Sequence, residues 1–129
     1  GATEEFNYYS WTSAEATQQD YDIWVRYTLP SDFDGFVSDS TLQFTGRREN
    51  SGDNVTTTTY RSTASATTIC GSATGLSTTA TWQTVTITGS ETGCSFVAGD
   101  TLLFRITVSA QSDRFVRVAD LKFNYTSGF

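Results

Sequence analysis

The chain has 129 residues, of which 37% are hydrophobic and 14% aromatic, enough for one folded domain with its own core. Eight Lys and Arg residues against fourteen Asp and Glu give a formal net charge of -6, so the basic patch that binds nucleic-acid phosphates is missing. Histidine, the most frequent general base and metal ligand, is absent. No apolar run is long enough for a membrane-spanning helix. We expect no nucleic-acid partner, no membrane insertion and no enzyme activity.

Alternation of apolar and polar residues dominates the N-terminal half and predicts β-strands. An aromatic strand is predicted at 5–11, followed by a loop or single helical turn at 12–19. The next strand, 21–27, places Tyr21, Ile23, Val25 and Tyr27 on one face. Strands at 41–45, with Leu42 and Phe44 inward, and at 55–60 complete this half.

The C-terminal half continues the same pattern. A short strand is predicted within 66–70, and one at 82–88 whose inward face stays ambiguous because Trp82 competes with Val85 and Ile87. The strongest strand contains Leu102, Phe104, Ile106 and Val108. In 115–125 the apolar phase slips at Ala119 and Asp120, as a β-bulge produces. Seven or eight strands predict an all-β, antiparallel two-sheet sandwich of jelly-roll type over residues 1–129.

Cys70 and Cys94 are the only cysteines and each has a glycine neighbour. A disulfide between them is the simplest interpretation. It would stabilise the fold by roughly 3.5 kcal/mol in the chain-entropy model and indicates an oxidising compartment. Two unrelated buried thiols are the alternative. Because the sequence starts at Gly1, we expect either a removed signal peptide or one domain of a longer chain.

Four segments carry a family resemblance: YTLPSDFDGF, TWQTVTITG, FVAGDTLLFRITVSA and RFVRVADLKFNYTS. They resemble the jelly-roll repeat domains of very large bacterial cell-surface proteins and related domains of phage head and tail fibres. The resemblance covers roughly residues 21–127 and is most specific at Ala98-Gly99-Asp100 and at Arg117, Val118 and Asp120. It implies a building block of a fibre, layer or appendage, and it carries no catalytic residue to any position of this chain.

The shared residues also have a direct physical interpretation. Gly99 permits a turn backbone, and Asp100 is expected to accept backbone N–H bonds at a strand entry. Asp120 is expected to pair with Arg105 or Arg117. All three roles are structural.

The N-terminal segment is the candidate assembly element. It is aromatic, with Phe6, Tyr8, Tyr9 and Trp11, and would be an edge strand in its own sandwich. Residues 1–19 are a possible exchanged N-terminal strand plus flexible stretch. If the strand inserts into the sandwich of a neighbouring copy, subunits join head to tail into an open polymer. An ordinary intramolecular first strand is the equal alternative.

Trp24 and Trp82 lie on otherwise polar strand faces, and Tyr60 is a third candidate. Exposed flat aromatics on an acidic β-sandwich stack on sugar rings, which predicts a carbohydrate-binding site. The competing interpretation is that each tryptophan covers an end of the core.

The loop 31–39 gathers three carboxylates, Asp32, Asp34 and Asp39, around Gly35. Calcium prefers several oxygen ligands on one flexible loop, so the sequence admits a calcium site here. A solvated acidic turn explains the same residues, and we expect no other cofactor.

Two N-glycosylation sequons begin at Asn54 and Asn124. Both asparagines occupy predicted polar positions, so a glycoprotein is sterically allowed.

These observations favour a non-enzymatic structural subunit or repeat of an extracellular filament, surface layer or fibre, assembled by β-strand and aromatic contacts. The alternatives are a carbohydrate-binding module and a virion decoration or fibre domain. All three place the chain outside the cell, at its surface or on a virion. The expected partners are further copies of the chain and glycans.

Overall fold

The computed structural model describes residues 8–37, 42–87 and 93–128. Within them the chain is all-β, and the predicted antiparallel two-sheet sandwich is confirmed. The described part contains ten strands, more than the seven or eight expected, because the short β3 and β10 add a small separate pair. The strands are β1 (Tyr8–Thr12), β2 (Gln19–Thr28), β3 (Phe33–Phe36), β4 (Leu42–Arg48), β5 (Asn54–Ser62), β6 (Thr67–Thr74), β7 (Gln83–Ile87), β8 (Thr101–Ala110), β9 (Phe115–Phe123) and β10 (Tyr125–Ser127).

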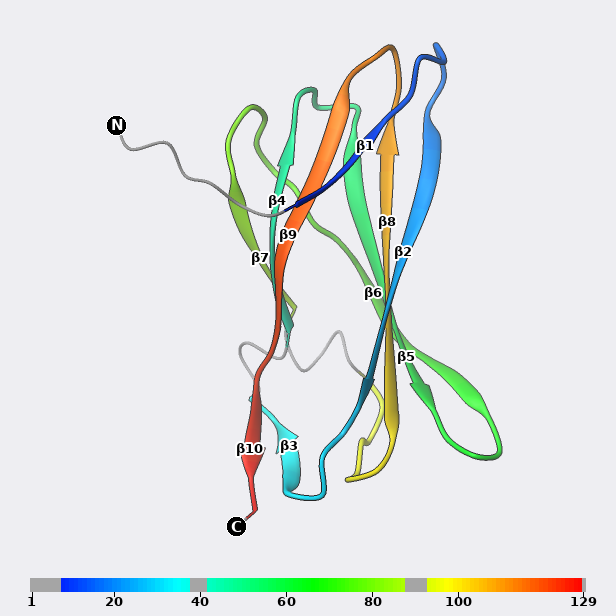
Figure 1. Cartoon of the computed structure of the whole chain (residues 1–129), viewed down its shortest axis with the longest axis vertical. Coiled ribbons are helices and arrows are strands. Elements are labelled where there is room, and N and C mark those ends of the chain that lie inside the picture. Colours follow the sequence, from blue (N-terminus) through cyan, green and yellow to red (C-terminus); the bar gives the residue numbers. More distant parts are fainter. Residues whose placement is uncertain (1–7, 38–41, 88–92, 129) are drawn as a thin grey trace.

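Two four-stranded sheets face each other (Figure 1). The first has the strand order β1-β9-β4-β7 and the second β2-β8-β5-β6. Apart from the hairpin of β5 and β6, the chain changes sheet at each step between the strands of these two layers. This connectivity places residues that are distant in sequence next to each other, which strand periodicity alone does not predict.

The core lies between the sheets and follows the predicted alternation. The inward positions of β8 are buried at Leu102, Phe104, Ile106 and Val108, and those of β4 at Leu42 and Phe44. In β7 the aliphatic side chains Val85 and Ile87 face inward, whereas Trp82 precedes the strand and is half-buried. That resolves the ambiguous face, because two aliphatics at spacing two fill the core where one indole would not.

The phase slip in β9 is a β-bulge, as predicted. The β4–β9 register shifts between Gln43 and Thr45, opposite the segment Ala119 to Lys122. Asp120 has a positive φ of 52° and its side chain is exposed. Because the bulge adds one residue, the alternation of faces shifts by one position after it. Leu121 and Phe123 therefore face the core, as Val118 does before the bulge.

The expected ion pair of Asp120 is wrong. Among the described residues the ion pairs are Arg61–Asp100 and Arg114–Asp53. Asp120 lies in the bulge with a positive φ, and its exposed side chain takes part in neither of these ion pairs. The bulge, and not a charge partner, accounts for this residue.

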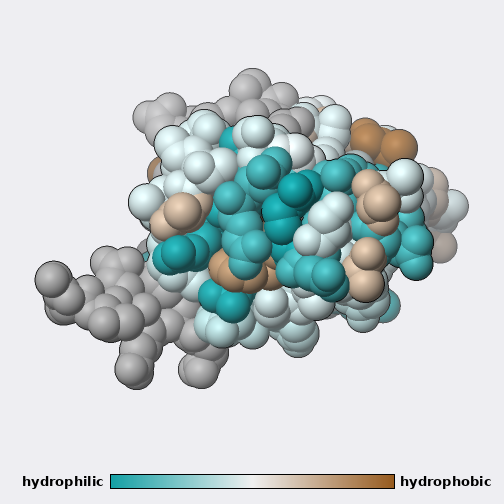
Figure 2. Space-filling model, turned by 90° about the horizontal axis from the view of Figure 1, so that it is seen from above, coloured by the Kyte–Doolittle hydropathy of each residue, from teal (hydrophilic) through white to brown (hydrophobic). Residues whose placement is uncertain are grey.

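One end of the sandwich is held by a buried polar network. Arg48 donates to the carbonyls of Ser77 and Thr78 at 3.0 and 3.1 Å and to that of Asp53 at 3.1 Å. The fully buried Asp53 carboxylate accepts from Arg114 Nε at 3.0 Å and from Gln18 Nε2 at 3.0 Å. Figure 2 looks onto this end, where hydrophilic residues dominate the centre and hydrophobic ones are scattered.

Cys70 on β6 and Cys94 form a disulfide, with Cα atoms 5.0 Å apart, as the sequence predicted. Gly93 N donates to the Cys70 carbonyl at 2.9 Å, and a Cβ at Gly93 would lie 2.9 Å from the same oxygen. Glycine is therefore required for this close approach. Within the described ranges, no helix is long and apolar enough to cross a bilayer.

Candidate functional site

The sandwich is open along one side, between β2 of one sheet and β9 of the other. β2 is the edge of its sheet, paired through Gln19 to Thr28 with β8 alone. On the facing side, β1 pairs with β9 only from Phe115 to Ala119. Beyond the bulge at Asp120, the same edge of β9 has no strand partner among the described residues. We call the opening between these two edges the open side.

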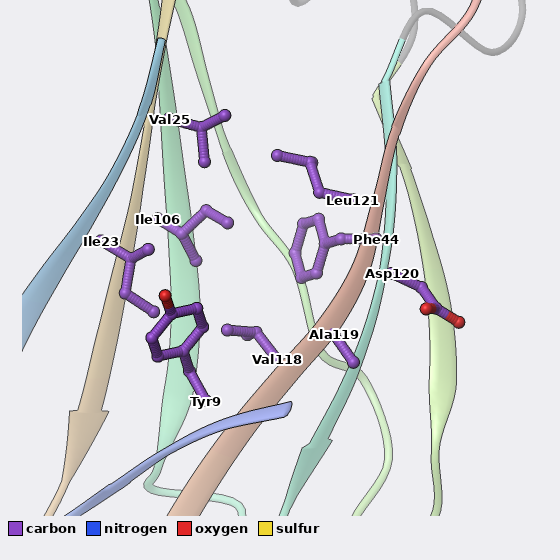
Figure 3. A pocket seen from close by; sticks show the side chains of 9 residues that line it. All are labelled: Tyr9, Ile23, Val25, Phe44, Ile106, Val118, Ala119, Asp120 and Leu121. Carbon is purple, nitrogen blue, oxygen red and sulfur yellow. The ribbon is translucent and has the colours of Figure 1, made fainter. Parts of the chain in front are cut away.

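An apolar cavity of about 150 Å³ occupies the open side (Figure 3). Ile23, Val25 and Ile106 of the second sheet point toward Val118, Leu121 and Phe44 of the first, Tyr9 lies across one end, and Asp120 points away. The lining residues are Tyr9, Ile23, Val25, Phe44, Ile106, Val118, Ala119, Asp120 and Leu121. An apolar hollow flanked by two unpaired strand edges is a suitable acceptor for a further strand.

Of the predicted assembly residues, Tyr9 lines this cavity, Tyr8 and Trp11 do not, and Phe6 lies outside the described residues. Trp11 stacks on Tyr21 with ring centroids 5.2 Å apart, and its indole N–H donates to the Gln19 carbonyl at 2.8 Å. Tyr9 is 70% exposed although its ring borders the cavity, and Tyr8 is 46% exposed on the outer face. β1 pairs with β9 of its own chain, and the exchange of residues 1–19 between copies stays a hypothesis.

The outer face of the second sheet brings two of the three predicted sugar-binding residues together. Trp24 on β2 and Tyr60 on β5 lie across β8, with ring centroids 5.6 Å apart and planes inclined by 33°. The guanidinium of Arg105 lies 5.6 Å from the Trp24 ring and 5.8 Å from the Tyr60 ring. Arg105 also donates to Thr58 Oγ1 at 3.0 Å, while its buried Nε has no partner. We call Trp24, Tyr60 and Arg105 the aromatic platform.

Trp82 does not join the platform. It precedes β7 of the other sheet, where its ring lies 5.8 Å from that of Tyr8. The three aromatic residues predicted to bind sugar therefore belong to two different faces of the molecule.

The predicted calcium loop is described only in part, because Asp39 lies outside the described residues. Asp32 Oδ2 accepts from Ser127 Oγ at 3.1 Å, which ties this turn to β10. The charge of Asp32, helped by desolvation, raises the pKa of Tyr125. No group of three metal-ligating side chains occurs in the part of the chain that the structure covers. Calcium binding stays a prediction.

Both sequon asparagines are half-buried. Asn54 Oδ1 accepts from the backbone N–H groups of Val55 and Leu76, at 2.8 and 3.2 Å. The backbone carbonyl of Asn124 accepts from Val37 at 3.0 Å. Glycosylation at either position stays a prediction.

The turn into β8 has the structure expected from Gly99 and Asp100. Gly99 adopts a positive φ of 87°, and Asp100 Oδ2 accepts from Val97 N at 3.0 Å and from Arg61 Nε at 2.7 Å. These bonds, with that of Arg61 the stronger, lower the pKa of Asp100. The role is structural.

Sequence reasoning missed Arg105 as part of the aromatic platform and the cavity as a site. Arg105 had been considered only as a partner of Asp120. Its position is readable from the β2–β8 register, which places Trp24 opposite Arg105, but periodicity does not predict that register. The sequence places Ile23 and Val25 on one strand face, and nothing in it shows that this part of the core is uncovered.

No protein-family model and no curated protein matches the sequence. Among solved structures, the carbohydrate-binding module TmCBM61 in complex with β-1,4-galactotriose is similar, with a TM-score of 0.55 and 12% identity over 91% of this chain and 69% of that one. This likeness supports the jelly-roll-like sandwich fold. A chain from the infectious bursal disease virus Gx strain matches at TM-score 0.31 and 16% identity, over 93% of this chain and 32% of that one. A TM-score this low does not establish a common fold.

Proposed function

We propose that this protein is a non-enzymatic structural subunit of an extracellular filament, layer or fibre, in which the open side receives a β-strand from a neighbouring copy. The observation that carries the proposal is the apolar cavity between the edges of β2 and β9, which have no strand partner there among the described residues. An added strand would satisfy backbone N–H and C=O groups of an edge and bury alternate side chains between the sheets.

The N-terminal strand is the donor that we favour. β1 pairs with the part of the β9 edge before the bulge over five residue pairs. β1 of another copy would use this pairing, and the residues that precede it would continue along the β9 edge into the open side. Residues 13–18, which join β1 to β2, would then act as the hinge. Such an exchange is heterologous, so the chain of contacts grows without closing and produces a polymer.

The disulfide is consistent with this setting. Cys70–Cys94 is stable in oxidising surroundings, such as the cell exterior or a virion surface. A virion decoration or fibre domain would use the same assembly principle in a different location.

Electron microscopy and size-exclusion chromatography of the purified chain test the proposal. We expect regular polymers from the wild type and their loss in Val25→Asp and Leu121→Asp, because each variant puts a carboxylate into the apolar cavity. Ile69→Asp is the matched control, since Ile69 is 66% exposed on β6, far from the cavity lining. Monomeric wild-type protein at all concentrations would contradict the proposal.

Deletion of residues 1–12 separates the donor from the acceptor. Loss of polymers on deletion, together with inhibition of wild-type polymerisation by a synthetic peptide of residues 1–12 that occupies the acceptor, supports β1 as the donor strand. Polymers that persist after the deletion would exclude β1 and leave another donor for the open side.

Glycan binding is a second candidate function, favoured by the aromatic platform. Trp24 is 53% exposed and lies beside Tyr60 and Arg105, an arrangement that offers ring faces for stacking and N–H donors for hydroxyl groups. The protein TmCBM61, whose fold is similar, was solved with a galactotriose.

Titration with neutral oligosaccharides tests this candidate. We expect saturable binding that is lost in Trp24→Ala and weakened in Tyr60→Ala, whereas Trp82→Ala, on the other sheet, retains it. Equal loss in Trp82→Ala, or no binding by the wild type, would argue against the platform.

A further inference from the structure

Two arginines stand directly opposite each other on the outer face of the first sheet. Arg47 of β4 and Arg117 of β9 are register partners. Their chain neighbours Arg48, Val116 and Val118 are buried on the core side. Because side chains alternate along a strand, both guanidinium groups lie on the outer face.

Nothing in the described part of the chain neutralises this pair. The ion pairs there engage Arg61 and Arg114 instead. The Nε atoms of Arg47 and Arg117 are buried and have no hydrogen-bond partner. Glu49, the nearest acidic residue along β4, is exposed and forms no ion pair. Like charges directly opposite on neighbouring strands are destabilising, and an unneutralised arginine pair is unexpected in a chain with a net charge of -6.

Aromatic rings hold one of the two arginines in place. The Arg117 guanidinium lies 3.6 Å from the centroid of the Phe115 ring and 4.8 Å from that of Tyr8. The Tyr8 ring in turn lies 5.8 Å from that of Trp82. These cation–π contacts fix the guanidinium through its faces. Because its Nε is buried, the terminal Nη donors are the ones left for a ligand.

We infer that Arg47 and Arg117, together with Tyr8, form a binding site for an acidic sugar residue of a polysaccharide. The planar, five-donor guanidinium matches the two oxygens of a carboxylate, and two such groups side by side suit a uronate. The Tyr8 ring, 46% exposed, provides a surface for the sugar ring. The site lies on the opposite sheet from the aromatic platform, and neither of its arginines lines the cavity of the open side.

Calorimetric titration of the full chain with a galacturonic acid trisaccharide, and with the neutral galactose trisaccharide, tests the inference. We expect the acidic trisaccharide to bind more tightly than the neutral one, with an affinity that added salt lowers. Arg117→Gln and Arg47→Gln should each lower the affinity at least about tenfold, the value of one charge-assisted hydrogen bond. Arg117→Lys keeps the charge but loses the planar fork, so it should give an intermediate affinity.

Arg26→Gln is the matched control. Arg26 is an exposed arginine of β2, in the other sheet, and its replacement removes the same charge. We expect an affinity within about twofold of wild type, because its distance from the site leaves only a screened charge effect.

An equal loss in Arg26→Gln would overturn the inference in favour of non-specific charge attraction. Wild-type protein that fails to bind the acidic trisaccharide, or binds the neutral one equally, would overturn it too. Thermal unfolding checks that each variant folds. If Arg117→Gln does not fold, Arg47→Gln and Arg117→Lys test the inference.

Discussion

The two halves of the sandwich close their shared core in different ways. In the half that contains β1, the strand covers the edge of β9, and Arg48 and Asp53 tie the surrounding loops together by buried hydrogen bonds. In the other half, beyond the bulge at Asp120, the core is reached through the open side. There the chain is held by the disulfide Cys70–Cys94 and by stacked aromatic rings such as Tyr27 on Phe123.

The difference indicates that the closed half mainly stabilises the fold, whereas the open half carries the proposed assembly site. A closed half in which Arg48 and Asp53 are held by buried hydrogen bonds tolerates little change at those residues. An open half that is held covalently keeps its fold while apolar side chains stay accessible to a partner strand. We therefore expect large stability losses from the closed half, and assembly defects with small stability losses from the open side.

Asp53→Ala should produce the largest loss in the isolated chain. The variant removes a fully buried carboxylate and leaves Arg114 and Gln18 without their acceptor, which costs roughly 3–5 kcal/mol of unfolding free energy. Urea unfolding followed by tryptophan fluorescence measures it. Asp20→Ala, at an exposed position of β2, is the control and should stay close to wild type. Similar losses in both variants would contradict the role of the buried network.

The disulfide should contribute almost as much on the open half. The double variant Cys70→Ser and Cys94→Ser should lose about 3.5 kcal/mol, because the bridge spans 24 residues of chain and restricts the unfolded state. Denaturant midpoints with and without a reductant provide the measurement. If reduction of the wild type leaves the midpoint unchanged, the open half is stabilised by its packing alone.

A pair of leucine truncations compares a fully buried core position with one that borders the cavity. Leu102→Ala, at a fully buried position, should cost roughly 2–5 kcal/mol, whereas Leu121→Ala, which borders the cavity, should cost about 1 kcal/mol in the monomer. In the assembled protein the cost of Leu121→Ala should rise, since the donor strand would cover this residue. Thermal unfolding of monomer and polymer distinguishes the cases, and an unchanged cost on assembly would argue against occupation of the open side.

The smallest effect is the acid dependence of the turn into β8. The pKa of Asp100 is lowered below its ordinary value of 3.8, first by the hydrogen bond from Arg61 and then by that from Val97 N. A lowered pKa in the folded state means that this contribution is complete above pH 3.8 and is lost as the pH falls through the folded value. Unfolding free energies from about pH 5 to about pH 2 should therefore fall less steeply in Asp100→Asn than in wild type. If the unfolding free energies of Asp100→Asn and wild type fall equally steeply with pH, the Asp100 carboxylate makes no such contribution to stability.

Most of the strand content was predictable, because alternation in sequence is a direct consequence of burying one face of a strand. Leu42 and Phe44, the run from Leu102 to Val108 and the slip at Ala119 and Asp120 all follow from that rule. The faces of β7 and the isolation of Asp120 did not follow from it, since they depend on which strand lies opposite. The disulfide was predictable because the chain has only two cysteines.

The sequence by itself determined a Thr-rich, acidic, all-β chain with inward aliphatic rows, one bulge and one disulfide. Only the tertiary structure decided that Trp24 meets Tyr60 across β8, that Trp82 lies on the other sheet, and that Arg47 faces Arg117. It also decided that β1 covers the β9 edge from Phe115 to Ala119, while the rest of that edge has no strand partner in the part of the chain that the structure describes. The reason is that periodicity is set within a strand by local backbone geometry, whereas neighbours are set by how the strands are ordered and registered in the two sheets, which depends on contacts between distant parts of the chain.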